Sequence, residues 1–111
     1  MTMKTASWVD LCGVERLVPE RGVAALVDGA QVAVFLVDGS VHAVDNLDPC
    51  SGAAVLSRGI VGSAGDRLVV SSPVYKQRFD LRTGACLDDE HARVGVWPAR
   101  VHHGRVEVAR P

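Results

Sequence analysis

Short runs of β-branched and other apolar residues, separated by glycine-containing turns, dominate this sequence. Residues 23–27, 31–37 and 41–44 are three such runs, and Asp28-Gly29 and Asp38-Gly39 separate them. Asp-Gly between two apolar runs favours a tight β-hairpin, because glycine accepts the positive φ that such turns require. The pattern therefore predicts three consecutive strands joined by hairpins.

The same pattern continues through the second half of the chain. Runs 59–62 and 67–71 flank one turn, and runs 79–81 and 85–87 flank another. Runs 94–97 and 99–101 precede a third turn, and run 105–108 follows it. Helical periodicity is nearly absent, and the best candidate, residues 88–93, is one turn at most. Strands that recur at about ten-residue spacing are typical of an antiparallel sandwich or barrel. We expect one all-β domain formed by residues 1–111.

The composition excludes several classes of function but says little about the fold. Of the 111 residues, 48% are apolar and 23% are charged, which is enough for a small core. The net charge of −1 argues against a nucleic-acid binder and against a polybasic membrane-surface module. No apolar stretch approaches the roughly 20 residues that span a bilayer, and residues 1–7 contain no apolar leader region. We therefore expect a cytoplasmic protein.

The cysteines and histidines do not form a local metal-binding motif. Cys12, Cys50 and Cys86 are widely spaced, and no histidine stands two to four residues from any of them. We expect three free thiols. His102 and His103 are adjacent in a terminal turn, and adjacent strand residues point to opposite faces, so we expect both side chains to be solvated.

Two long polar loops interrupt the strand pattern, at residues 45–59 and 71–79. Loops on a rigid β-scaffold frequently carry function. The first loop ends in Leu56-Ser-Arg-Gly59, and the second reads Ser72-Pro-Val-Tyr-Lys-Gln-Arg-Phe79. These loops resemble the cluster-binding loops of Rieske ferredoxin-like domains, which carry a Cys-x-His motif and a Cys-Pro-x-His-Gly-x-x-Phe motif. The resemblance covers about residues 7–108 and implies a Rieske-like antiparallel β-sandwich or barrel with two protruding loops.

The cluster ligands of that family are absent from these motifs. Ser72 and Tyr75 stand at the Cys and His positions of the second loop. The Cys-x-His positions of the first loop fall within Asp48, Pro49, Cys50 and Ser51, which contain no such motif. A Rieske centre needs two thiolates and two imidazoles, and hydroxyl oxygens are poor substitutes. We expect no iron–sulfur cluster and no other cofactor in this chain.

A cluster-free Rieske-like domain with Ser-Pro-x-Tyr-Lys-Gln-x-Phe closely resembles one family, the small subunits of bacterial NAD(P)H-dependent nitrite reductases. The resemblance implies a large-subunit partner that carries FAD, an iron–sulfur cluster and sirohaem and reduces nitrite to ammonium. It also implies a small subunit with no catalytic residues of its own, which stabilises or orients the large one. The alternative is a cluster-free regulatory or assembly module for another oxidoreductase.

The residues that could contact a partner belong to the two loops. They are Asn46, Asp48, Cys50, Arg58, Tyr75, Lys76, Gln77 and Arg78. Two alternatives remain open for Asp45, Asn46 and Asp48, which could face a partner or could fix the first loop through side-chain to backbone hydrogen bonds. Phe79 is expected in the core. Ser72 has no accompanying His and Asp, so we expect a turn residue and not a nucleophile.

Overall fold

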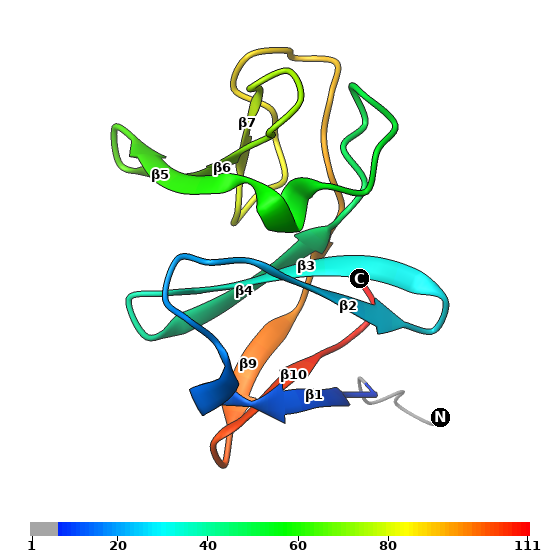
Figure 1. Cartoon of the computed structure of the whole chain (residues 1–111), viewed down its shortest axis with the longest axis vertical. Coiled ribbons are helices and arrows are strands. Elements are labelled where there is room, and N and C mark those ends of the chain that lie inside the picture. The colour runs from blue at the N-terminus through cyan, green and yellow to red at the C-terminus, as the bar shows by residue number, and fades with distance from the viewer. Residues whose placement is uncertain (1–6) are drawn as a thin grey trace, which may run out of the picture.

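The computed structural model describes residues 7–111; the expectation about a leader in residues 1–7 therefore lies largely outside the described residues. The described chain forms ten β-strands and two 3₁₀ helices in three antiparallel sheets, which lie one above another in Figure 1. The elements are β1 (Val9–Gly13), η1 (Val14–Arg16), β2 (Val23–Val27), β3 (Ala30–Val37), β4 (Ser40–Asp45), η2 (Leu56–Arg58), β5 (Ile60–Ala64), β6 (Arg67–Ser71), β7 (Arg78–Asp80), β8 (Val96–Trp97), β9 (Ala99–His102) and β10 (Arg105–Val108). The predicted all-β class is confirmed.

The central sheet has the order β2-β3-β4-β8 and begins with the two predicted hairpins. Asp28 and Gly29 have φ values of 49° and 83°, and Asp38 and Gly39 have 50° and 80°. Positive φ at both central residues is typical of the type I′ turn that fits the twist of a hairpin. The Asp-Gly signals therefore predicted these turns correctly.

The lower sheet contains a strand that the sequence pattern did not predict. β1 pairs with β10, and β10 pairs with β9. The ladder between β1 and β10 shifts register between Asp10 and Cys12, and this bulge interrupts the alternation of apolar and polar positions. At the other end of the molecule, residues 88–93 contain a turn and no helix. The sequence pattern predicted at most one helical turn there.

The strand β3 lies between two hydrophobic clusters. Ala33, Phe35 and Val37 pack in the cluster that includes Phe79. On the opposite face of the strand, Val32 and Val34 pack in the second cluster. Successive side chains of a strand point to opposite faces, so a strand buried on both faces reads as a continuous apolar run. Phe79 is fully buried, as predicted.

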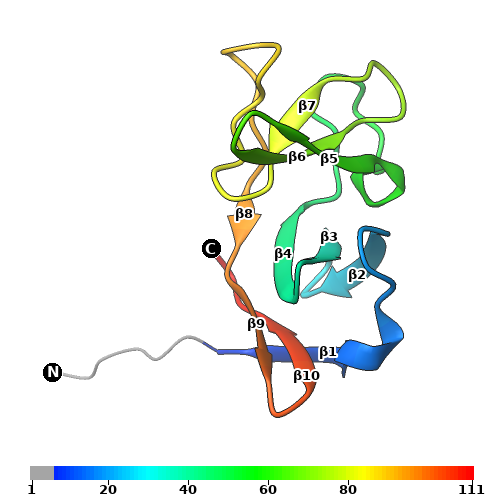
Figure 2. The ribbon, with the colours of Figure 1, turned by 90° about the vertical axis from the view of Figure 1, so that its left-hand side faces the viewer.

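The upper sheet, of order β5-β6-β7, forms the part of the molecule from which the long loops extend (Figure 2). The first loop leads from β4 through η2 into β5, and the second joins β6 to β7. Within residues 7–111 there is no helix of the length and apolarity that crossing a bilayer requires.

Candidate functional site

A buried hydrogen bond joins the two long loops. The Ser72 hydroxyl donates to Oδ2 of Asp48 at 2.5 Å, and both side chains are fully buried. The other carboxylate oxygen, Oδ1, accepts the backbone N–H of Cys50 at 2.8 Å. Ser72, at the cysteine position of the second-loop motif, thus bonds directly to Asp48, one of the four residues within which the ligand positions of the first loop fall.

The carboxylate of Asp48 is held in its ionised form. Burial acts to raise its pKa, but hydrogen bonds from the Ser72 hydroxyl, from the amide of Cys50 and from Ser51 outweigh burial, and the pKa lies below its ordinary value. Hydrogen bonds to the charged form of a carboxyl group favour that form. Asp48 is therefore an anionic acceptor inside the loop pair.

The second loop is closed on Ser72. The amide of Ser72 donates to the carbonyl of Gln77 at 2.8 Å, and the amide of Lys76 donates to the carbonyl of Ser72 at 3.1 Å. Lys76 has a φ of 67°, which lets the chain reverse within the loop. Tyr75, at the position of a Rieske histidine, is 62% exposed and points out of the closed loop.

The first loop is fixed by the side chain of Asn46, which is buried. Its Nδ2 donates to Oε1 of Gln31 at 3.1 Å and to the carbonyl of Ala54 at 3.2 Å, and its Oδ1 accepts the amide of Ser57 at 2.7 Å. Asn46 and Asp48 therefore make the loop-internal hydrogen bonds that one of the two sequence interpretations expected. Their side chains support the loop and do not lie on its surface.

Asp45 fixes the base of the first loop in a similar way. Its Oδ2 accepts the amide of Gly95 at 2.9 Å, and its Oδ1 accepts Nε1–H of Trp97 at 2.8 Å. These two bonds connect the end of β4 to Gly95, just before β8, and to Trp97 in β8 itself. The three acidic and amide side chains at 45, 46 and 48 thus all serve loop structure.

The remaining predicted contact residues differ in their availability. Lys76 and Arg58 are exposed, whereas Cys50 and Gln77 are partly buried. The pKa of the Cys50 thiol is raised, first by burial and then by the charge of Asp48, so the thiolate is disfavoured. Oε1 of Gln77 is buried and has no hydrogen-bond partner within residues 7–111.

Arg78 is engaged within the chain. Its Nη2 and Nε donate to the carboxylate of Asp88 at 2.7 and 3.1 Å, and its backbone amide donates to the same carboxylate at 2.8 Å. The side-chain bond from Arg78 lowers the pKa of Asp88. This pairing joins β7 to the segment that follows Leu87.

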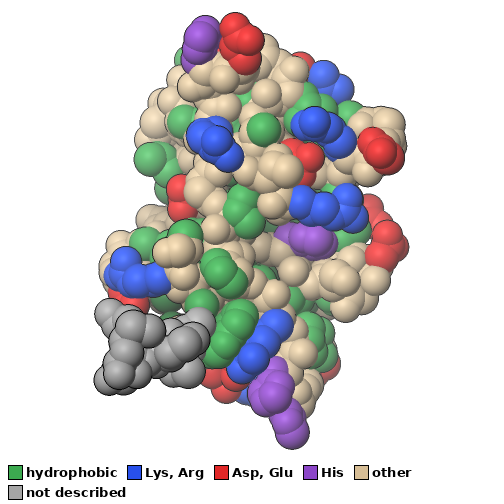
Figure 3. All heavy atoms as spheres, turned by 180° about the vertical axis from the view of Figure 1, so that it is seen from behind, with side chains coloured by type: hydrophobic (Ala, Val, Ile, Leu, Met, Phe, Trp, Pro, Cys, Tyr) green, Lys and Arg blue, Asp and Glu red, His purple; other side chains and the backbone are tan. Residues whose placement is uncertain are grey.

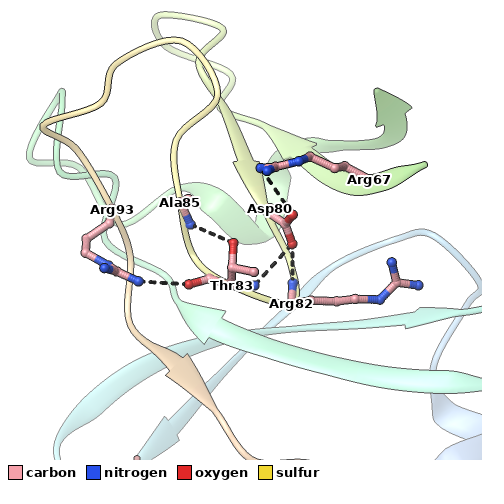
Figure 4. A network of polar contacts seen from close by, with 6 residues as sticks. All are labelled: Arg67, Asp80, Arg82, Thr83, Ala85 and Arg93. Carbon is pink, nitrogen blue, oxygen red and sulfur yellow. Dashed lines mark hydrogen bonds and ion pairs between the residues drawn. The ribbon is translucent and has the colours of Figure 1, made fainter. Parts of the chain in front are cut away.

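A further polar network lies in the turn after β7 (Figure 4). Oδ1 of the buried Asp80 accepts the amides of Arg82 and Thr83 at 2.7 and 3.1 Å, and Arg67 lies 3.6 Å from Oδ2. Arg93 donates to the Thr83 carbonyl at 3.0 Å. The network holds the turn against β6 and against the chain before β8.

The surface of the two loops is more apolar than the sequence analysis suggested. We define the loop tip as the exposed residues Leu47, Pro49, Pro73, Val74, Tyr75 and Lys76. Leu47, Val74 and Tyr75 are 52%, 43% and 62% exposed. Leu47 and Val74 were not among the predicted contact residues, because a loop sequence has no period that shows which side chains face outward.

The donor atoms of the loops do not fit a Rieske cluster. The pair at the junction, Asp48 and Ser72, supplies oxygen atoms that are bonded to each other, and Cys50 is the one nearby thiol among the described loop residues. Throughout residues 7–111 there is no group of three or more His, Cys, Asp or Glu side chains that could hold a metal ion. Two thiolates and two imidazoles would be required.

The charges on the surface are mixed in sign. On the face seen in Figure 3, basic and acidic side chains are interspersed with hydrophobic ones. Neither sign forms a continuous area on that face, which agrees with the net charge of −1. This face therefore does not have the extended basic surface that nucleic-acid binding requires.

Comparison with known proteins places the chain in a family. The family model described as "Rieske-like [2Fe-2S] domain" matches residues 7–109. The chain is 41% identical over 105 residues to the nitrite reductase (NADH) small subunit of Escherichia coli (strain K12), covering 93% of this chain and 97% of that protein. It is similar to the crystal structure of a protein assigned as the NADH-dependent nitrite reductase small subunit of Mycobacterium tuberculosis, with a TM-score of 0.93, 54% identity, and coverage of 97% of this chain and 98% of that one.

A third relative is a much longer protein. The nitrite reductase [NAD(P)H] large subunit of Klebsiella oxytoca is 41% identical over 101 residues, which are 91% of this chain but 11% of that protein. The chain therefore spans about a tenth of the length of this relative, in which a domain of this type is one part of a longer polypeptide.

Proposed function

Because the chain belongs to the Rieske-like family of NAD(P)H nitrite reductase small subunits, we propose that it acts as the small subunit of such an oxidoreductase. It associates with a large subunit that contains FAD, an iron–sulfur cluster and sirohaem and that reduces nitrite to ammonium. The chain itself contributes neither a cofactor nor a catalytic residue. A cytoplasmic location, and a single domain over residues 1–111, remain predictions that belong to this proposal.

The hydrogen bond between Ser72 and Asp48 is the observation that carries this proposal. It connects Ser72, at the cysteine position of the second-loop motif, to Asp48 in the stretch of four residues that contains the ligand positions of the first loop, and both groups are fully buried. A domain that keeps both loops in a defined conformation without metal ligands retains a surface for binding but not a site for electron transfer. This favours the subunit role over a ferredoxin-like carrier role.

The loop tip is the proposed contact with the large subunit. It consists of exposed apolar side chains, one tyrosine and Lys76. Aromatic residues are enriched at the centre of protein interfaces, whereas lysine is usually found at the rim. The Klebsiella oxytoca protein, in which the same type of domain lies within a large subunit, supports a close functional association of the two parts.

The proposal is tested by measuring nitrite-dependent NADH oxidation by the large subunit with and without this chain, together with size-exclusion chromatography of the mixture. We expect a joint peak and a higher rate in the presence of the chain. Two separate peaks with unchanged rates would overturn the subunit role and favour the alternative of a module for another oxidoreductase. Iron and inorganic sulfide in stoichiometric amounts in the purified chain would overturn the cofactor-free part.

The contact surface is tested by Tyr75→Ala combined with Lys76→Glu. Truncation of a central interface residue commonly costs more than about 1 kcal/mol, so we expect the Kd for the large subunit to rise about tenfold. Arg16→Glu is the matched control, because it reverses a charge on the exposed η1, outside the two loops. Equal affinities for the tip variant and this control would show that the loop tip is not the contact.

A further inference from the structure

The free edge of the upper sheet lacks the features that normally prevent another strand from pairing with it. β5 is the edge strand of the order β5-β6-β7, and its ladder with β6 runs over all five residues without a register shift. Its sequence, Ile-Val-Gly-Ser-Ala, contains no charge and no proline. Natural edge strands are usually protected by charged residues, proline, bulges or short length.

Most other edge strands of the molecule carry such protection. β1 contains a bulge and Asp10, β9 contains Arg100, and β7 has three residues, of which two are charged. β8 has two residues. β2 is uncharged like β5, but only β5 of these two contributes residues to the groove described below. β5 is therefore the edge strand that is both unprotected against pairing and next to a groove.

The register identifies the backbone groups that face outward. Ala64 and Arg67 flank the two-residue turn and form a hydrogen-bonded pair, so hydrogen-bonded and non-hydrogen-bonded pairs alternate from there. Ser63 and Val61 then belong to the non-hydrogen-bonded pairs, and their N–H and C=O groups point away from β6. The carbonyl of Leu68, opposite Ser63, accepts the amide of Leu81 on the far side of β6 at 2.9 Å, which agrees with this alternation.

A groove at the start of β5 adds side-chain chemistry to this edge. It has a volume of about 480 Å³ and lies between the segment Glu20–Gly22 and the segment Ser57–Val61. Arg21 and Arg58 are both exposed, and neither forms an ion pair within residues 7–111. Ile60 is 74% exposed beside them. The groove therefore presents two guanidinium groups that have no ion-pair partner among residues 7–111, one carboxylate and a large apolar side chain.

We propose that β5 binds an extended segment of the large subunit as an added antiparallel or parallel strand. The segment carries an acidic side chain that reaches Arg21 and Arg58, and an apolar side chain that packs on Ile60. Strand addition of this kind derives affinity from main-chain hydrogen bonds and specificity from side chains along the edge. The inference rests on the proposed association with the large subunit and adds a second contact besides the loop tip.

The first experiment is amide hydrogen exchange of the full chain, free and in complex with the large subunit. We expect slower exchange at Val61 and Ser63 in the complex, and little change at Ile60 and Gly62, whose amides already face β6. A complex that forms without protection at Val61 and Ser63 would overturn the strand addition and leave the subunit role intact. The absence of any complex would overturn both proposals.

The second experiment compares Ser63→Pro with the matched control Ser63→Ala. Proline removes the outward N–H of residue 63 and none of the bonds between β5 and β6, and proline is tolerated on edge strands in that orientation. We expect the Kd for the large subunit to rise at least tenfold for Ser63→Pro and to stay within twofold for Ser63→Ala. Equal affinities of the two variants would contradict the proposal.

Charge variants test the groove and the choice of edge. Arg21→Glu with Arg58→Glu should raise the Kd about tenfold, whereas Ala24→Lys on the exposed edge of β2 should leave it unchanged. If Ala24→Lys alone weakens binding, the partner uses β2 and the assignment to β5 is wrong. Protection of Val61 and Ser63 that rises with the concentration of the chain alone would identify a second copy as the occupant instead of the large subunit.

Discussion

Removal of the Ser72 hydroxyl tests whether its bond to Asp48 holds the two loops together. In Ser72→Ala the buried carboxylate keeps its bonds from the backbone of the first loop but loses its donor from the second loop. A hydrogen bond to a charged group contributes about 1.5–3 kcal/mol, and full burial favours the upper part of that range. We expect the free energy of unfolding at pH 7 to fall by about 2–3 kcal/mol and Tm by about 10 °C or more.

The effect should depend on pH in a defined direction. Burial raises the pKa of Asp48, but its hydrogen bonds, led by that from Ser72, outweigh burial and place the pKa below the ordinary value of 3.8. The ionised carboxylate therefore stabilises the fold above pH 3.8, and this stabilisation is lost as the pH falls through the lower folded value. The difference between the wild type and Ser72→Ala should accordingly be full at neutral pH and should shrink in acid.

Urea denaturation followed by circular dichroism, at pH 7 and at steps into the acid range, measures both quantities. Ser71→Ala is the matched control, because Ser71 precedes Ser72 in the chain and its hydroxyl forms no hydrogen bond within the described residues. Asp48→Ala, which removes the acceptor, completes a double-mutant cycle that isolates the interaction. A loss no larger than that of Ser71→Ala, or a loss that does not change with pH, would refute the assignment of the bond as the connection between the loops.

Three further predictions concern the turn after β7 and the two lower sheets. Asp80→Ala should cost about 2–3 kcal/mol in urea denaturation, because two backbone amides lose their buried acceptor, whereas Arg67→Ala, which is half exposed and 3.6 Å away, should cost less than about 1 kcal/mol. Gly84→Ala should lower the free energy of unfolding by more than about 2 kcal/mol in thermal unfolding, because Gly84 has a φ of 79° and an added Cβ would collide with neighbouring backbone. Gly104 has a similar φ of 75° but open space around it, so Gly104→Ala should cost only about 1 kcal/mol. The pKa of His42 lies below 6.5, first through burial and then through a nearby arginine, so stability should fall as the pH drops below 6.5, and His42→Gln should remove that component from a urea titration; an unchanged pH profile would contradict it.

The strands that the sequence predicted correctly are those whose signal is local. The runs on either side of Asp28-Gly29 and Asp38-Gly39 carry both the apolar pattern and the turn residues, and β3 is apolar from Val32 to Val37 because both of its faces are buried there. β1 gave no such signal. Its bulge disturbs the period of two, and its partner β10 lies at the opposite end of the chain. A short stretch of sequence does not predict pairing between strands that lie so far apart in the chain.

The loops were located by sequence, but the directions of their side chains were not. Asn46 and Asp48 are polar residues in a loop, and a polar loop residue is usually exposed. They are buried here because each finds hydrogen-bond partners from another part of the chain, Gln31 for Asn46 and Ser72 for Asp48. Leu47, between them, is 52% exposed. A loop has no fixed period, so only the three-dimensional contacts decide which residues face inward.

The residues that hold the loops together differ from the residue proposed to bind the large subunit, so stability and binding can be changed separately. A metal centre would hold both loops through a few strong bonds. Here the Ser72–Asp48 bond connects the two loops, the bonds of Asn46 fix the first loop, and the second loop is closed by its own backbone bonds. Tyr75 takes part in none of these side-chain bonds and is mostly exposed. Tyr75→Ala should therefore weaken binding to the large subunit without lowering Tm by more than about 2 °C, because exposed substitutions usually change stability by less than about 0.5 kcal/mol. Ser72→Ala should lower both the affinity for the large subunit and the Tm. If Tyr75→Ala unfolds the domain as readily as Ser72→Ala, the tyrosine is part of the loop structure and the loop tip is not an independent binding surface.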